Sequence, residues 1–323
     1  MEQTAISLKN VTKTFGDVYA NKDVTMEIRK GEILALLGEN GSGKTTLMNM
    51  IAGIYYPDAG EILVDGEPVA IRSPKDAYEL GIGMVHQHFK LVDVFTAAEN
   101  MVLGMDAGSK LNRKTVAAEI SEICNKYGFE VNPDQKVYDM SVSQKQTLEI
   151  VKVLYRGADI LILDEPTAVL TPQETEKLFH VIRNMKKNGK SIIIITHKLH
   201  EVLSLSDRVA ILRKGEYIDT VETAKATESS LTEMMVGKKV ELNIDRPEIK
   251  NKVKRLSLKN ISCLSKDGVE VLKDISFDVY GGEILGIAGV SGNGQKELLE
   301  AIAGLQLVKE NGSIEYYEPE DGK

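Results

Sequence analysis

A glycine-rich segment at residues 38–45 has the residue types and the spacing needed to hold phosphate groups. It reads Gly-Glu-Asn-Gly-Ser-Gly-Lys-Thr. Its glycines let successive backbone N–H groups converge on phosphate oxygens, and the N-terminus of the following helix adds to the attraction. We expect Lys44 to bridge the β- and γ-phosphates of a nucleotide and Thr45 to hold Mg²⁺ through its hydroxyl. The pattern predicts a phosphate-binding loop, or P-loop.

Two further apolar runs end in side chains that could act on a bound nucleotide. Residues 160–163 lead into Asp164 and Glu165, and residues 191–196 lead into His197. Open α/β sheets place ligands at the carboxyl ends of their strands, so we expect Asp164 to hold the Mg²⁺ shell. Glu165 is then positioned to polarise an attacking water. A histidine after a strand is often structural, but His197 could also donate to the γ-phosphate and keep the water in register.

The pattern of apolar runs and helix-breaking residues predicts the elements that hold these side chains. Residues 5–37 alternate in short runs and predict antiparallel strands, whereas residues 33–37 form a continuous apolar strand that is buried on both faces. The predicted helices and caps are 45–54, 113–127 capped by Asn112, 144–156 capped by Ser143, and a helix from Pro172 that closes at Gly189. Strands at 160–163 and 191–196 complete the expected α/β core.

Bulk composition restricts the class of protein. The 323 residues suggest about two domains, and a net charge of −8 argues against a nucleic-acid binder that neutralises phosphates. The longest apolar runs are too short for a bilayer span, and residues 1–10 do not have the pattern of a secretory leader. Cys124 and Cys263 form no ligand or disulfide pattern, so we expect them to be packing thiols. These features predict a cytosolic protein.

The chain also carries one segment twice. Residues 31–47 read GEILALLGENGSGKTTL and residues 282–298 read GEILGIAGVSGNGQKEL. A repeat at this spacing indicates two copies of one domain. The second copy has Gln295 and Lys296 in place of the lysine and threonine of the first P-loop, so we expect it to be degenerate. The predicted organisation is a first domain at 1–237, a linker at 238–255, and the N-terminal part of a second domain at 256–323, which ends before that domain is complete.

Together these motifs make the chain similar to ATP-binding cassette (ABC) ATPases over its whole length. The resemblance implies an α/β fold with a P-loop NTPase (RecA-like) core, an antiparallel β subdomain and an α-helical signature subdomain at about 91–157, followed by the start of a second copy. It implies ATP and Mg²⁺ as cofactors, and ATP hydrolysis as the activity.

The resemblance also assigns roles to individual residues. Phe15 matches the aromatic residue that stacks on adenine, and Gln87 matches the glutamine that links Mg²⁺ to a membrane partner. The expected nucleotide-binding residues are Phe15, Gly38, Glu39, Asn40, Gly41, Ser42, Gly43, Lys44, Thr45, Thr46 and Gln87. The expected Mg²⁺ ligands are Thr45, Gln87 and Asp164, and the expected catalytic residues are Lys44, Glu165 and His197. The signature element, which acts on a nucleotide held by an opposite domain, matches Ser141, Val142, Ser143 and Gln144.

Three positions depart from the family pattern. Val142 and Ser143 replace two glycines of the signature, and Thr171 replaces an aspartate in the loop after Glu165. Because each site pairs one domain's P-loop with the other's signature, the altered P-loop with Gln295 would face the altered signature. The resemblance therefore predicts one competent and one impaired site.

Within the family, the chain most resembles importers of simple sugars and nucleosides. The segments that carry this resemblance are residues 141–144, 165–174, 234–237 and 289–295, and the last of them favours nucleosides. Such a subunit would lie on the cytoplasmic face of the cell membrane and dock through residues 87–100. Its expected partners are integral membrane permease subunits, a second nucleotide-binding domain and, indirectly, an extracytoplasmic substrate-binding protein, with no nucleic acid. Two alternatives remain: a soluble ABC ATPase that acts on ribosomes or DNA, and a nucleotide-sensing module.

Overall fold

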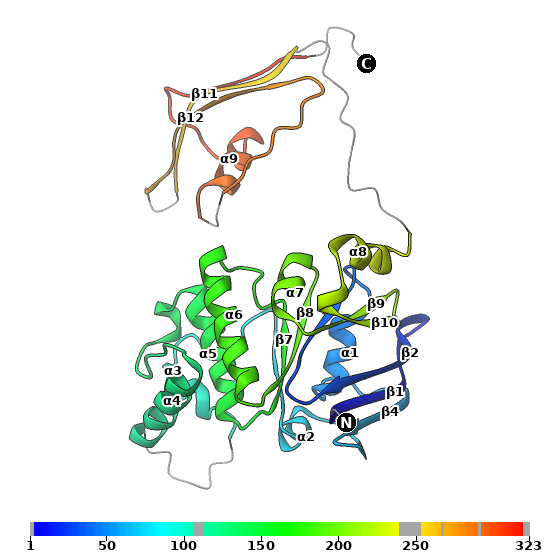
Figure 1. Cartoon of the computed structure of the whole chain (residues 1–323). Helices are drawn as coiled ribbons and strands as arrows, with labels where there is room; N and C mark the ends of the chain where they lie inside the picture. Colours follow the sequence, from blue (N-terminus) through cyan, green and yellow to red (C-terminus); the bar gives the residue numbers. More distant parts are fainter. Residues whose placement is uncertain (1–2, 106–112, 239–252, 266–267, 290–291, 319–323) are drawn as a thin grey trace. The chain divides into compact units, whose positions relative to one another are not determined.

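The structure, a computed structural model, describes residues 3–105, 113–238, 253–265, 268–289 and 292–318. It separates into two compact units, Met1–Val240 and Glu241–Lys323, which are described one at a time (Figure 1). The predicted cap Asn112 and most of the predicted linker at 238–255 lie outside the described residues.

The first unit contains two sheets and a set of helices. Its strands are β1 (Thr4–Phe15), β2 (Val18–Arg29), β3 (Ile33–Leu37), β4 (Ala59–Val64), β5 (Glu67–Val69), β6 (Ile82–Val85), β7 (Ile160–Asp164), β8 (Ser191–Thr196), β9 (Arg208–Arg213) and β10 (Glu216–Glu222). Its helices are α1 (Lys44–Ile51), α2 (Pro74–Glu79), α3 (Ala97–Val102), α4 (Arg113–Tyr127), α5 (Val142–Tyr155), α6 (Pro172–Lys187), α7 (Leu199–Leu205) and α8 (Glu228–Val236), with the short 3-10 helices η1 (Val137–Asp139) and η2 (Thr223–Lys225).

The larger sheet brings the predicted catalytic strands together. Its strand order is β10-β9-β3-β8-β7-β6, and its pairs are parallel apart from the antiparallel hairpin of β9 and β10. In this register Leu37 pairs with Thr196 and Asp164 pairs with Ile195, so the carboxyl ends of β3, β7 and β8 lie side by side at one end of the sheet. The smaller sheet is antiparallel, with the order β2-β1-β4-β5. The predicted α/β fold with an antiparallel β subdomain is confirmed.

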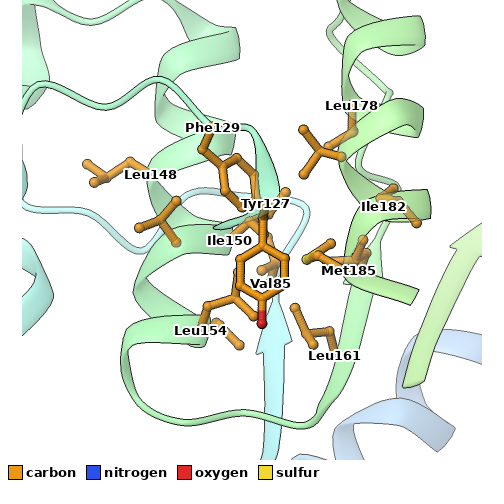
Figure 2. Packing of buried hydrophobic residues seen from close by; sticks show 14 of the residues in the cluster. Val85, Tyr127, Phe129, Leu148, Ile150, Leu154, Leu161, Leu178, Ile182 and Met185 are labelled. Atoms are coloured by element: carbon orange, nitrogen blue, oxygen red, sulfur yellow. The ribbon is translucent and has the colours of Figure 1, made fainter. Parts of the chain in front are cut away.

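Alternate residues of the larger sheet face two different cores, as the pleat of a strand requires. On one face, Leu34 and Leu36 pack with α1 and with buried side chains of the antiparallel sheet. On the other face, Leu161 and Leu163 pack with helices α4, α5 and α6. Figure 2 shows this second core, in which Tyr127 lies among side chains from α5, α6, β6 and β7. Both faces are buried, which explains the continuous apolar runs in the sequence.

Two helix starts differ from the predicted ones. The helix after the P-loop is Lys44–Ile51 rather than 45–54, and its N-cap is Gly43 in a left-handed conformation. The cap of α5 is Ser141 rather than Ser143: the Ser141 hydroxyl accepts the Gln144 N–H, and the Gln144 side chain accepts the Ser141 N–H. This reciprocal capping box satisfies two backbone donors, so the helix begins two residues earlier than expected.

The second unit is smaller and contains β11 (Lys254–Leu264), β12 (Glu270–Tyr280), α9 (Gln295–Ile302) and β13 (Ser313–Tyr316). Its antiparallel sheet has the order β12-β11-β13. As in the first unit, the helix after the glycine loop has a left-handed glycine, Gly294, as its N-cap. Residues 283–289, which repeat the sequence around β3, form no strand, and Ile284 is 98% exposed.

Candidate functional site

The glycines of the P-loop are required by close backbone contacts. A Cβ atom on Gly38 would lie 2.3 Å from the carbonyl oxygen of Leu212, and one on Gly43 would lie 2.3 Å from that of Ala20. Gly43 also has a φ of +97°, a region that disfavours residues with side chains. The loop is therefore held tightly between β9 and β2, with room only for glycine at these two positions.

Lys44 lies inside this loop. It is 6% exposed, and its ammonium group donates to the carbonyl oxygens of Gly38, at 2.8 Å, and Glu39, at 2.9 Å. Burial lowers the pKa of Lys44, while the nearby Glu165 and Asp164 carboxylates act to raise it. The ammonium group is thus held between the loop and the acidic end of β7, where a terminal phosphate would meet it.

Thr45 and Asp164 form the pair expected for a metal. The Thr45 hydroxyl is close to the Asp164 carboxylate, which is 5% exposed. Burial raises the pKa of Asp164, the Thr45 hydroxyl lowers it, the Glu165 charge raises it and the Lys44 charge lowers it. Hydroxyl and carboxylate oxygens are ligands that suit Mg²⁺. Among the described residues no group of three or more His, Cys, Asp or Glu side chains could hold a metal alone, so phosphates and water would complete the shell.

Glu165 joins the ends of three neighbouring strands. Its Oε1 lies 2.9 Å from Nδ1 of His197, and its Oε2 accepts a hydrogen bond from the Gln87 side-chain amide at 3.4 Å. Gln87 follows β6, Glu165 follows β7 and His197 follows β8, so the parallel register brings these predicted residues together. The arrangement places a base, an imidazole and an amide around one point at the sheet edge.

The other predicted loop residues differ in their surroundings. Glu39 and Asn40 are exposed, as is Thr45, and Thr46 is half-buried. Ser42 is buried, and its hydroxyl has no hydrogen-bond partner in the described structure. A hydroxyl without a partner beside the glycines is suited to a phosphate oxygen.

Phe15 lies at the end of β1 and is 47% exposed. Its ring packs edge-to-face against Tyr55 with centroids 5.3 Å apart, and the ammonium group of Lys13 lies 5.7 Å from its centroid. Asp58 anchors this segment by accepting hydrogen bonds from Lys13 Nζ at 2.8 Å and from the backbone and hydroxyl of Thr14 at 2.7 Å each. Phe15 remains exposed enough for a planar base to stack on its ring.

Sequence reasoning missed several residues that support the site from outside the predicted motifs. Asn21 of β2 donates to the Gly43 carbonyl at 3.3 Å, and Gly215 links Ser42 to Lys22 through backbone hydrogen bonds of 3.1 and 2.8 Å. Tyr55 and Asp58 were missed in the same way. These residues are distant in sequence from the P-loop, and no motif marks them.

The signature residues form a separate part of the unit. Ser141 caps α5, and Val142, 45% exposed, and Ser143 open its first turn. Ser143 and Gln144 line a cavity of about 430 Å³ whose other walls are further residues of α5, residues of α6, Leu170 and the segment 128–130. The structure does not bring these residues to the P-loop of the same unit.

Comparisons with known proteins show which proteins the chain is similar to. Residues 21–168 match the family model described as ABC transporter. The chain is 49% identical over 98% of its length to the nucleoside import ATP-binding protein NupA of Lactococcus lactis, and 47% identical over 96% of its length to the guanosine import ATP-binding protein NupO of Bacillus subtilis. It spans 62% and 61% of the lengths of these two relatives.

A solved structure shares the fold of the first unit. CbiO1 of Clostridium perfringens, part of the ABC transporter complex cbiONQ, matches 69% of this chain and 90% of its own, with a TM-score of 0.61 and 29% identity. Within the residues that the structure describes, no helix is both long enough and apolar enough to cross a bilayer. The P-loop, the Glu165 cluster, the family match and this fold lead to one conclusion: the first unit of the chain has the fold of an ABC transporter ATP-binding cassette.

Proposed function

We propose that the chain is the ATP-binding and ATP-hydrolysing part of a membrane importer, with one competent P-loop at residues 38–45. The observation that carries this proposal is the cluster of Gln87, Glu165 and His197 at the strand ends. It lies beside the buried Lys44, whose pKa responds to Glu165 and Asp164. A module that only senses nucleotide would need the phosphate loop but no base with two orienting partners.

In this proposal each residue has a defined role in the hydrolysis of ATP. Loop N–H groups and Lys44 bind the β- and γ-phosphates, and Phe15 stacks on the base. Thr45 and Asp164, with Gln87, hold Mg²⁺, which neutralises charge on the phosphates when bound. Glu165 accepts a proton as water attacks the γ-phosphorus and the bond to ADP breaks. In this proposal Nδ1 of His197 donates to Glu165 and orients it. Nε2 can donate to the phosphate at the same time only if it also carries a proton, so the ring must then be doubly protonated.

The names of the relatives support a proposal for the transported molecule and the partners. The two relatives described above are named as import proteins for nucleosides and for guanosine. The segment 289–295 also favours nucleoside importers, so we propose nucleosides before simple sugars as the transported molecule. The partners would be integral membrane permease subunits contacted through residues 87–100, and indirectly an extracytoplasmic substrate-binding protein. The subunit would then lie on the cytoplasmic face of the membrane.

Two substitutions test the proposal. We expect Lys44→Ala to weaken ATP binding by at least about tenfold, because an ammonium group on phosphate contributes a charge-assisted hydrogen bond. Glu165→Gln should keep ATP affinity but reduce turnover by about 10²-fold or more. Titration with a fluorescent ATP analogue measures binding, and a phosphate-release assay measures turnover. Lys177→Ala, at an exposed position of α6, is the control. Unchanged turnover in both variants would refute the assignment.

A further inference from the structure

Glu165 needs support on both sides to keep its backbone conformation. Its φ of +47° is a left-handed value, and the next residue, Pro166, favours extended backbone in the residue before it. Such a conformation persists only where the surrounding structure fixes the chain. On the side of β8, the Glu165 N–H donates to the Ile195 carbonyl at 2.9 Å. On the other side, the first side chain that is tied down is Thr167.

Thr167 is joined to the segment that follows His197. It is 2% exposed, and its hydroxyl lies 2.7 Å from both carboxylate oxygens of Glu201 in α7, to which it donates. Lys198 Nζ donates to the Thr167 carbonyl at 3.0 Å and to the hydroxyl oxygen at 3.1 Å. The same ammonium group lies 3.0 Å from Oε1 of Glu201. We call Thr167, Lys198 and Glu201 the Thr167 clamp; sequence reasoning gave these three residues no role.

The contact between the hydroxyl and the carboxylate is the strongest part of the Thr167 clamp. The Glu201 side chain is only 12% exposed, and a shielded hydrogen bond to a charged group contributes more than a neutral one. The Lys198 side chain is more open to solvent, so its ion pair with Glu201 contributes little by itself. The Thr167 hydroxyl is therefore the group whose removal should loosen the clamp.

The Thr167 clamp is attached to a fixed element. Val202 of α7 lies in the same buried cluster as Leu37 of β3, and Leu205 lies in the core formed with α4, α5 and α6. Core packing on both sides therefore sets the position of Glu201. Thr167, in a loop, is held by α7 rather than the reverse.

The clamp encloses the contact between Glu165 and His197. Thr167 lies two residues after Glu165, and Lys198 directly follows His197. Both partners of that 2.9 Å contact lie beyond the ends of their strands, so β7 and β8 alone do not fix the distance between them. The clamp joins the two segments just beyond the contact and limits how far they can separate.

We propose that Thr167 and Glu201 are positioning residues that keep Glu165 in its left-handed conformation, with its carboxylate beside His197. They act through Glu165 and are not themselves catalytic. The consequence for ATP turnover rests on the proposed function, whereas the restraint on the loop does not.

Hydrogen–deuterium exchange of the complete chain tests the restraint. Thr167→Val keeps the shape of the side chain and removes the hydroxyl, whereas Thr167→Ser keeps the hydroxyl. We expect exchange at residues 168–171 to be about tenfold faster in Thr167→Val, as for the loss of a hydrogen bond to a charged group, and close to wild type in Thr167→Ser. Thr175→Val, at a half-buried position of α6, is the matched control and should leave this segment unchanged. Exchange in Thr167→Val equal to that of the wild type would overturn the restraint.

Turnover tests the consequence for Glu165. In the protein assembled with its partners, we expect Thr167→Val to lower kcat by about tenfold and to leave KM for ATP unchanged, because the P-loop is not altered. Thr167→Ser should restore most of the activity. A residue with a purely structural role would lower Tm but leave kcat unchanged at a temperature where the variant is folded, and that result would overturn the proposal.

A double substitution tests whether the two residues act through one contact. Glu201→Ala should lower kcat about as much as Thr167→Val, and the variant that combines both should lie within about twofold of either one. Glu201→Gln, which keeps an acceptor for the hydroxyl, should lose less activity than Glu201→Ala. Effects of the two substitutions that multiply would show independent roles and contradict the proposal.

Glu165→Gln separates this inference from the proposed function. Full turnover in Glu165→Gln would refute the proposed function, and the exchange experiment would still decide whether the restraint exists. Loss of turnover in Glu165→Gln together with a wild-type kcat in Thr167→Val would refute the positioning role alone.

Discussion

At the scale of single residues, Glu165 depends on an unusual backbone conformation. Its φ is +47°, a left-handed value that costs free energy for a residue with a side chain. The conformation turns the chain directly after β7, where the Glu165 N–H donates to the Ile195 carbonyl at 2.9 Å. The carboxylate can then contact both Gln87 and His197. The sequence identifies this glutamate, but its conformation and its two contacts come from the neighbouring strands.

The buried Asp164 predicts an effect of pH on stability. A carboxyl group whose pKa is raised on folding destabilises the folded state while the group is ionised. This cost disappears as the pH falls through the raised pKa, because the group then takes up a proton. We therefore expect Asp164→Asn to raise Tm by a few degrees at pH 7.5 without nucleotide or Mg²⁺, and by less near pH 4. Scanning calorimetry at the two pH values measures the difference. A lower Tm at pH 7.5 would contradict the stated cause.

Asp58 predicts the opposite dependence. Hydrogen bonds from Lys13 and Thr14 lower the pKa of Asp58 from 3.8 to about 2. Its contribution is present above the unfolded-state value of 3.8 and is lost as pH falls toward about 2. Urea denaturation should show Asp58→Asn to be less stable than the wild type at pH 7, with the gap closing in acid. Because Asp58 anchors the segment that ends at Phe15, the variant should also bind ATP more weakly; Asp65→Asn, on an exposed turn, is the control.

At the scale of elements, two segments with a similar apolar pattern have different structures. Residues 33–37 form β3, which pairs with β8 on one side and β9 on the other. Residues 284–288 repeat that apolar pattern but pair with no strand within the described residues of the second unit. A parallel strand obtains its hydrogen bonds from neighbours distant in sequence. Its formation is therefore decided by those neighbours, even where the local pattern favours it.

The N-cap of α5 also acts at the scale of a single element. We expect Ser141→Ala to lower the free energy of unfolding by about 1 kcal/mol, because the Gln144 N–H would lose its acceptor. Thr147→Ala, in the next turn, is the comparison, since its hydroxyl only bonds back to the Ser143 carbonyl. Urea denaturation of the three proteins measures the effect. A smaller loss in Ser141→Ala than in Thr147→Ala would contradict the cap.

At the scale of the whole molecule, the two units differ at the position that contacts phosphate. The first unit has Lys44 in its loop, and the second has Gln295, an uncharged amide, at the start of α9. An amide cannot replace the charge-assisted hydrogen bond of an ammonium group. The molecule is therefore expected to bind nucleotide asymmetrically.

Calorimetric titration with an ATP analogue and Mg²⁺ tests this asymmetry. We expect one strong site per chain, its loss in Lys44→Ala, and an affinity within about twofold of wild type in Gln295→Ala, since only the first loop carries the lysine. Two equal sites, or a loss of binding in Gln295→Ala, would show that the second loop also binds strongly.

The sequence by itself determined the fold class and the chemistry of the P-loop. Glycines, a lysine and a threonine at fixed spacing, and apolar runs that end in Asp164, Glu165 and His197, are local patterns that one stretch of chain can encode. The two helix starts were predicted less accurately, because several residues near each start can serve as a cap.

Only the tertiary structure decided which distant residues act together. The parallel register of β6, β7 and β8 brings Gln87 and His197 to Glu165. The same holds for residues 283–289, whose strand-like sequence remains without a strand. Hydrogen bonds between strands and across helices join residues far apart in the chain, so they depend on the fold and not on spacing.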